Sequence, residues 1–217
     1  EIIRPLLNNF FKNNDLNCDE CDFSGSLLNK LPNLPNCKIV KLQDLNELTE
    51  LPALPQCEIL DIEHANELTE LPALPQCKSI SFSGNKISRF PDLPNCEDLY
   101  IDEARKLTSL GSLPKCVTLE CRISKLTSLP DLPKCHKLNC SFNELTSLPA
   151  LPVCTDIHCY GNRLTSLQNI PSCQFLDCSN NQLISLPNLP RCREVNCSNN
   201  QLISLPNLPR CREVNCS

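Results

Sequence analysis

The sequence contains no tryptophan and no methionine, and aromatic residues make up only 4% of its 217 residues. Glycine is also rare, with 4 copies against 19 prolines, which argues against ordinary glycine-based turns. The apolar residues are almost all Leu, Ile, Val and Cys. Such a composition favours a core of small, repeatedly stacked layers and argues against one large, irregular core.

The charge distribution and the lack of long apolar runs argue against nucleic acid and membranes as partners. The 25 acidic and 20 basic residues are mixed along the chain and leave a net charge of −5, without the basic stripe of a nucleic-acid-binding protein. No apolar run approaches the roughly 18 residues that cross a bilayer, so no membrane association is expected. Residues 1–17 show neither the basic start nor the apolar centre of a signal peptide.

A repeat of 19 or 20 residues runs along nearly the whole chain. Its clearest copy is CHKLNCSFNELTSLPALPV at residues 135–153. A period this short predicts a solenoid in which each coil is one repeat. The first cysteine of the phrase marks eleven coils: Cys18, Cys37, Cys57, Cys77, Cys96, Cys116, Cys135, Cys154, Cys173, Cys192 and Cys211.

The segment after this cysteine predicts the strand and the turn of each coil. Apolar and polar residues alternate as in a short strand, so the stacked coils should form a parallel sheet on the concave face. An inward asparagine is expected at the turn, where its amide can satisfy backbone groups. Three coils have one extra residue, at 43–46, 63–66 and 102–105, and should bulge at the concave rim. The asparagine position is occupied by Asn46, Asn66, Asn85, Asn143, Asn162, Asn181 and Asn200, and in two coils by Arg105 and Ser124.

The rest of the phrase, L-T-S-L-P-x-L-P, predicts the convex side. Proline at every third residue excludes helix and favours an extended, polyproline-like chain without a second hydrogen-bonded ladder. Residues 1–17 lie outside the repeat and suggest a short helical cap on the array at 18–217. Residues 180–198 recur identically as 199–217, and no cap follows. A bare last strand could allow end-to-end self-association.

The 18 cysteines are explained by their place in the repeat. Beyond the eleven already given, Cys21 takes a leucine position and the others take a third apolar position. Free cysteine behaves as a small buried hydrophobe, which suits a narrow coil. Cβ atoms in adjacent parallel strands lie too far apart for a bridge, so the cysteines should stay reduced, as in a reducing compartment. Zinc binding or redox chemistry at Cys18-x-x-Cys21 is the weaker alternative, and no cofactor is expected.

The outward side chains of the strands are the candidate binding site. Exposed Tyr, Arg and other aromatic residues in the middle of a concave sheet are typical of protein interfaces, although single exposed aromatics are also common without a function. The terminal coils offer mainly Asn and Ser and look like spacers. The candidate residues are Tyr100, Glu120, Arg122, Phe142, His158, Tyr160, Phe175 and Asp177.

Catalysis is not expected from this sequence. His136 and His158 occupy different positions of the repeat and have no nucleophile beside them. The carboxylates are scattered over a solvated face. The sequence has no glycine-rich phosphate loop and no recognised spacing of metal ligands.

The phrase L-x-x-L-P-x-L-P, with a short strand and Asn, resembles the leucine-rich repeats of the secreted bacterial effectors of the IpaH and YopM kind. The resemblance covers residues 18–217 and implies a leucine-rich-repeat solenoid that recognises a host protein in a reducing intracellular compartment such as the host cytoplasm. The cysteine-rich strand is not typical of those effectors and is similar to repeats of amoeba-associated bacteria and large DNA viruses. Three roles follow: an effector or scaffold, the substrate-recognition part of a larger ubiquitin ligase, or a surface adhesin.

Overall fold

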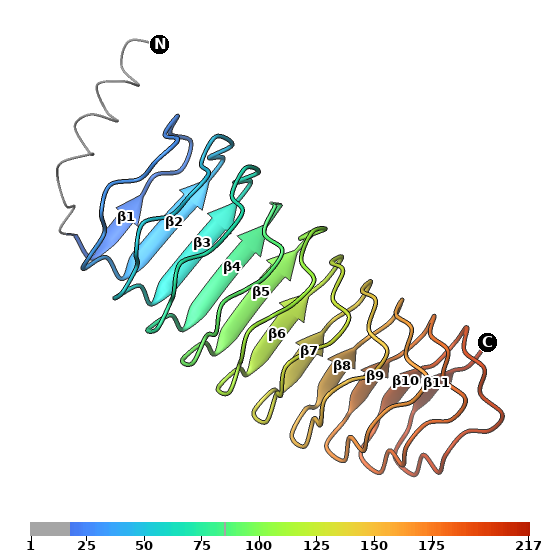
Figure 1. The fold of residues 1–217 in the computed structure, drawn as a ribbon. Coiled ribbons are helices and arrows are strands. Elements are labelled where there is room, and N and C mark those ends of the chain that lie inside the picture. Colours follow the sequence, from blue (N-terminus) through green and yellow to red (C-terminus); the bar gives the residue numbers. More distant parts are fainter. Residues whose placement is uncertain (1–17, 85) are drawn as a thin grey trace.

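The computed structural model describes residues 18–84 and 86–217, and these residues form one elongated stack of coils with a single sheet along one side (Figure 1). The sheet has eleven strands, all parallel and in chain order. The predicted solenoid with a parallel sheet is therefore confirmed. The strands are β1 (Glu20–Asp22), β2 (Ile39–Gln43), β3 (Ile59–Glu63), β4 (Ser79–Ser83), β5 (Asp98–Asp102), β6 (Thr118–Cys121), β7 (Lys137–Asn139), β8 (Asp156–His158), β9 (Phe175–Asp177), β10 (Glu194–Asn196) and β11 (Glu213–Asn215).

Helix is absent from the described part of the chain, and no segment of it could cross a membrane as a helix. The helical cap expected over residues 1–17 falls outside the described residues. The coils are joined without helices because the sequence between strands contains proline at short intervals, which removes amide donors.

The core is a narrow column between the sheet and the extended convex side. Each strand turns its second residue inward, and Val40, Leu60 and Leu138 are almost fully buried in this way. The repeated cysteine lies just before the strand and is also buried in most coils. Its thiol donates a weak hydrogen bond to the carbonyl oxygen two residues later, as in Cys135 to Lys137 at 3.1 Å. Cysteine thus fills the space of a small apolar residue and satisfies a carbonyl at the same time.

Each turn after a strand contains one residue with positive φ, followed by an inward residue. Phe142 has φ 56° and Asn143 follows it. The Asn143 amide donates to the carbonyl oxygens of Cys121 (2.7 Å) and Cys140 (3.1 Å), and its oxygen accepts from the Leu126 amide (3.0 Å). Asn162, Asn181 and Asn200 make the same set of bonds one coil further on each time. The predicted asparagine ladder is confirmed for these four coils.

In the coils with an extra residue, the predicted position of the asparagine is wrong. Asp44, His64 and Glu103 have the positive φ, and the inward residues after them are Leu45, Ala65 and Ala104. The extra residue follows the inward position instead of preceding the turn, so Asn46, Asn66 and Arg105 are exposed. The backbone closes the turn here, since the amide of the next leucine bonds the carbonyl of the inward residue, at 2.8–3.0 Å. A side-chain amide is therefore not needed at this turn.

The convex side is extended and buries two or three leucines per coil, such as Leu145, Leu148 and Leu151. Two coils depart from the proline pattern, at Gly111 and Gln168. A Cβ at Gly111 would meet the carbonyl oxygen of Pro91 at 2.3 Å. The close approach accompanies backbone bonds from Phe90 to Ser109 (3.1 Å) and from Leu93 to Ser112 (3.0 Å). Other coils are bonded to one another at the start of this side, as from Glu144 to Leu126 (2.9 Å) and from Arg163 to Leu145 (2.9 Å).

The asparagine ladder generates a first prediction. Asn162→Ala should lower the free energy of unfolding by about 2–4 kcal/mol, because the buried Leu145 amide and two carbonyls lose their partner. Asn46→Ala is the matched control and should change it by less than about 0.5 kcal/mol, because Asn46 is exposed. Urea denaturation followed by circular dichroism measures both. Equal losses would contradict the division of the asparagines into two groups.

Candidate functional site

The outward face of the sheet presents two continuous rows of side chains. The strands pair without any shift, so the first residues of all strands lie side by side, and so do the third residues. Adjacent strands are about 4.8 Å apart, and neighbouring side chains in a row therefore interact directly. This regular register decides which of the candidate residues meet.

Phe142 and Tyr160 form the first cluster, at the edge of the sheet where the chain leaves the strands. Their ring centroids are 4.9 Å apart at an interplanar angle of 81°, an edge-to-face contact. Phe142 also lies against the backbone of Gly161, where a Cβ would meet its ring at 2.8 Å. Phe142 is nevertheless 53% exposed, so the pair offers an apolar surface to solvent.

Tyr100, Glu120 and Arg122 lie two coils nearer the N-terminus. Tyr100 and Glu120 are direct neighbours in the row of third residues. Partial desolvation and the carboxylates of Asp98 and Glu120 raise the pKa of the Tyr100 hydroxyl above its ordinary value. The Arg122 guanidinium bonds Asp102 at 3.1 Å, so its charge is already balanced within the protein. The second oxygen of that carboxylate, Oδ1, is buried and lacks a hydrogen-bond partner among the described residues.

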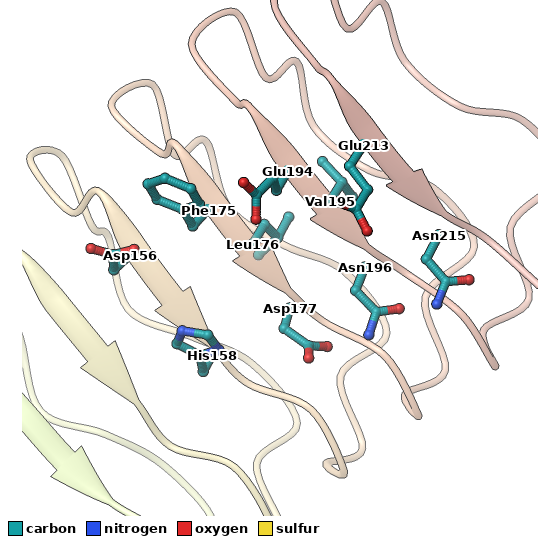
Figure 2. A pocket seen from close by; sticks show the side chains of 10 residues that line it. All are labelled: Asp156, His158, Phe175, Leu176, Asp177, Glu194, Val195, Asn196, Glu213 and Asn215. Carbon is teal, nitrogen blue, oxygen red and sulfur yellow. The ribbon is translucent and has the colours of Figure 1, made fainter.

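His158, Phe175 and Asp177 line an open hollow of about 400 Å³ over β8–β11 (Figure 2). Their side chains rise from neighbouring strands, with His158 directly beside Asp177 in the row of third residues. The Asp177 carboxylate is oriented by two bonds from Ser179, one from the amide (3.1 Å) and one from the hydroxyl (2.7 Å). The register thus places the candidate residues in neighbouring groups, and a second shallow hollow joins Glu120 to His158.

Part of the hollow was not among the candidate residues. Its walls also include Asp156, Glu194 and Glu213, which are the first residues of their strands. Of the first residues of the strands, only Phe175 was counted among the candidates, so the carboxylates at this position were left out. Alternation around Ile157 and Val195 would have revealed these positions. The terminal coils, interpreted as spacers, in fact contribute carboxylates to the face.

Most of the buried thiols are poorly suited to nucleophilic chemistry, although hydrogen bonds with Cys154 and Cys173 lower the pKa of Cys135 and Cys192. Burial raises the pKa of Cys121, Cys140 and Cys159 far above the ordinary value for a thiol, because a buried thiolate would lose its hydration. Burial likewise raises the pKa of Cys96 to about 12. The thiolate, which is the reactive form, is therefore scarce at neutral pH.

The expectation that all repeat cysteines stay reduced is wrong for the first coil. Cys18 and Cys21 form a disulfide, with their Cα atoms 6.7 Å apart. Both belong to the same coil, because Cys21 occupies a leucine position, so the spacing between strands does not limit them. The sulfur of Cys37 lies in the next coil, and the three sulfurs are within 4.8 Å of one another. Among the described residues this is the one group that could hold a thiophilic metal ion, and it could do so only in its reduced form.

The raised thiol pKa values generate a second prediction. Unfolded cysteines lose their protons near pH 8.5–9, whereas buried thiols with a raised pKa, such as Cys140 and Cys159, keep theirs, so the unfolded state binds fewer protons at these positions above that pH. Stability is therefore present below about pH 8.5 and falls as pH rises towards the higher native pKa, by about 1.4 kcal/mol per pH unit for each such thiol.

Urea midpoints measured between pH 7 and pH 10 test this. The Cys140→Ala, Cys159→Ala variant is less stable at neutral pH because it leaves two small cavities, but its midpoint should fall less steeply with pH. A parent whose midpoint is constant up to pH 10 would contradict the prediction.

Comparison with known proteins places the fold. No family model and no curated protein sequence matches the chain. Solved structures do match: YopM of Yersinia pestis, described as a leucine-rich effector protein, is 29% identical with a TM-score of 0.63, over 89% of this chain and 70% of YopM. YopM of Yersinia enterocolitica WA-314 is 28% identical with a TM-score of 0.59, over 92% of this chain and 56% of the other. The chain is a leucine-rich-repeat solenoid, and bacterial effectors of the YopM kind are its structural neighbours.

Proposed function

We propose that this chain is a protein-interaction module that binds a partner protein on its sheet face. The observation that carries the proposal is the exposed Phe142 in a left-handed turn. A bulky residue is disfavoured at positive φ. The equivalent residues in later coils are Gly161, Asn180 and Asn199, which tolerate it, and the preceding coil has Ile123, which is less exposed than Phe142. Phe142 therefore costs backbone energy and gains only part of the burial that would offset it. A partner that covers the ring would supply the rest.

The surroundings of Phe142 support an interface in this region. Tyr160 holds the ring in an edge-to-face contact, so little side-chain freedom would be lost on binding. Aromatic residues that are fixed in this way are preferred anchors of protein interfaces. Shallow hollows over β6–β8 and β8–β11 lie along the same sheet and share Asp156 and His158.

The proposal includes the setting and the mode of action. The chain acts by binding and not by catalysis, in the manner of a scaffold or effector, and its partner is a protein of a host cell. The likeness to the YopM structures supports this setting, and the high pKa of the buried thiols supports a role without nucleophilic chemistry. A reducing compartment such as the host cytoplasm would keep the fourteen buried free cysteines as thiols.

The repeat supplies a variant that should fold normally and generates a third prediction. Phe142→Asn introduces the residue found in two later turns, and Tyr160→Ser introduces the residue of Ser141, Ser179 and Ser198. The double variant should keep its thermal stability within a few degrees, since Asn relieves the strain at positive φ. Affinity capture from eukaryotic cell lysate should lose its specific partner, with binding weakened at least about tenfold.

Ile184→Thr is the matched control. It removes an exposed apolar side chain from the convex side and installs the residue of Thr146 and Thr165. Its captured partner should be unchanged. A partner that the double variant retains, or that Ile184→Thr loses, would overturn binding at the Phe142–Tyr160 pair.

A further inference from the structure

The sheet face is much more acidic than the rest of the chain. The first and third residues of the eleven strands include nine carboxylates and two lysines, a net charge of −7, whereas the whole chain has −5. All other positions together are therefore slightly basic. The carboxylates are Glu20, Asp22, Asp61, Asp98, Glu120, Asp156, Asp177, Glu194 and Glu213.

Ion pairs within the protein balance some carboxylates of the N-terminal half. Glu20 pairs with Lys41 (2.8 Å) and Asp102 with Arg122 (3.1 Å). In the hollow over β8–β11 the situation differs. Its four carboxylates, Asp156, Asp177, Glu194 and Glu213, have no Lys, Arg or His nitrogen within ion-pair distance anywhere in residues 18–84 and 86–217.

The arrangement of these carboxylates is unfavourable for the isolated protein. Glu194 and Glu213 are register neighbours, and like charges directly opposite one another in a sheet repel. Lys137 is the register neighbour of Asp156 in the row of first residues, and Arg193 and Arg212 directly precede Glu194 and Glu213. None of the three lines the hollow or forms an ion pair with its carboxylates. A positively charged ligand would remove this repulsion.

Phe175 gives the hollow its specificity. In the row of first residues it lies between Asp156 and Glu194, so its ring has a carboxylate on each side. Figure 2 shows the ring and these side chains projecting from the same face of the sheet. A guanidinium can stack on an aromatic face and bond carboxylates through its edge, which a compact ammonium cannot do equally well. The site therefore fits arginine better than lysine.

We infer that the hollow over β8–β11 binds an extended, arginine-rich segment of the partner protein. This inference rests on the proposed function and adds the chemistry of the partner. The distance from Asp156 to Glu213 is three strand spacings, about 14 Å, which about four extended residues span. Two or three basic side chains in such a segment reach all four carboxylates, with one guanidinium over Phe175.

The experiment uses a fluorescein-labelled peptide of about eight residues, alternating Arg and Ala, and measures fluorescence anisotropy with the full chain. The parent should bind this peptide, and binding should weaken as salt rises from about 50 to 300 mM, since surface charges are screened. The same peptide with Glu in place of Arg should not bind.

Neutral substitutions locate the site. Asp156→Asn, Asp177→Asn, Glu194→Gln should weaken binding at least about tenfold. The local structure tolerates Asp177→Asn, because the equivalent serines in other coils donate the same two bonds to the asparagines Asn139, Asn196 and Asn215. Phe175→Thr, which introduces the residue of Thr118, should weaken binding about threefold.

Glu70→Gln, Glu97→Gln, Asp131→Asn removes the same charge from exposed positions outside the two rows and should leave binding within about twofold of the parent. Equal weakening by both triple variants would overturn the inference, because the attraction would then be general. A captured partner that is lost by the Phe142→Asn, Tyr160→Ser variant and kept by the Asp156→Asn, Asp177→Asn, Glu194→Gln variant would uphold protein binding and overturn the arginine-rich segment.

Discussion

The sheet depends on how each strand is ended. A residue with positive φ reverses the chain in ten successive turns from Gly25 to Asn199, and in most of the described turns the residue after it enters the core. This reversal leaves a backbone amide of the following segment inside the protein, and a buried amide without a partner is costly. The coils satisfy it in two ways, with an asparagine side chain as at Asn143 or with a backbone carbonyl as at Ala104. Both solutions preserve the strand register, and the register in turn aligns the side chains on the open face.

The two solutions divide the array into halves of different character. Strands β2–β5 have five residues, and several coils there are linked on the surface by ion pairs such as Glu58–Lys78 and Glu67–Lys86. Strands β7–β11 have three residues, and buried cysteine and asparagine dominate their coils. Exposed ion pairs contribute little stability and weaken as the salt concentration rises. The hydrogen bonds of the buried asparagines are not weakened by salt in this way. The second half is therefore internally fixed, and its outward charges are free for a partner.

Most of the fold could be predicted because the same pattern of buried and exposed positions recurs in eleven coils. The cysteine spacing defines the coils, and alternation around Leu138 or Ile157 defines the strands. The position of the extra residue could not be predicted from the sequence. Asn46 and Asn66 are asparagines, as the repeat pattern requires, but the residues that enter the core at these turns are Leu45 and Ala65. The Cys18–Cys21 disulfide lies within one coil, so the spacing between adjacent strands gave no information about it. Of the candidate site, the aromatic residues stood out by type, but the carboxylates before each inward residue required the register.

The identical segments 180–198 and 199–217 have a consequence for how such an array changes in evolution. The junction between two identical coils is the same before and after one is copied or lost, so recombination between the repeats alters the length without creating a new packing problem. Each copy also brings its outward residues, and Glu213 stands beside Glu194 for that reason. A surface of this kind can grow by duplication first and acquire its selectivity afterwards, through single substitutions at positions such as Phe175 that face solvent and leave the core unchanged.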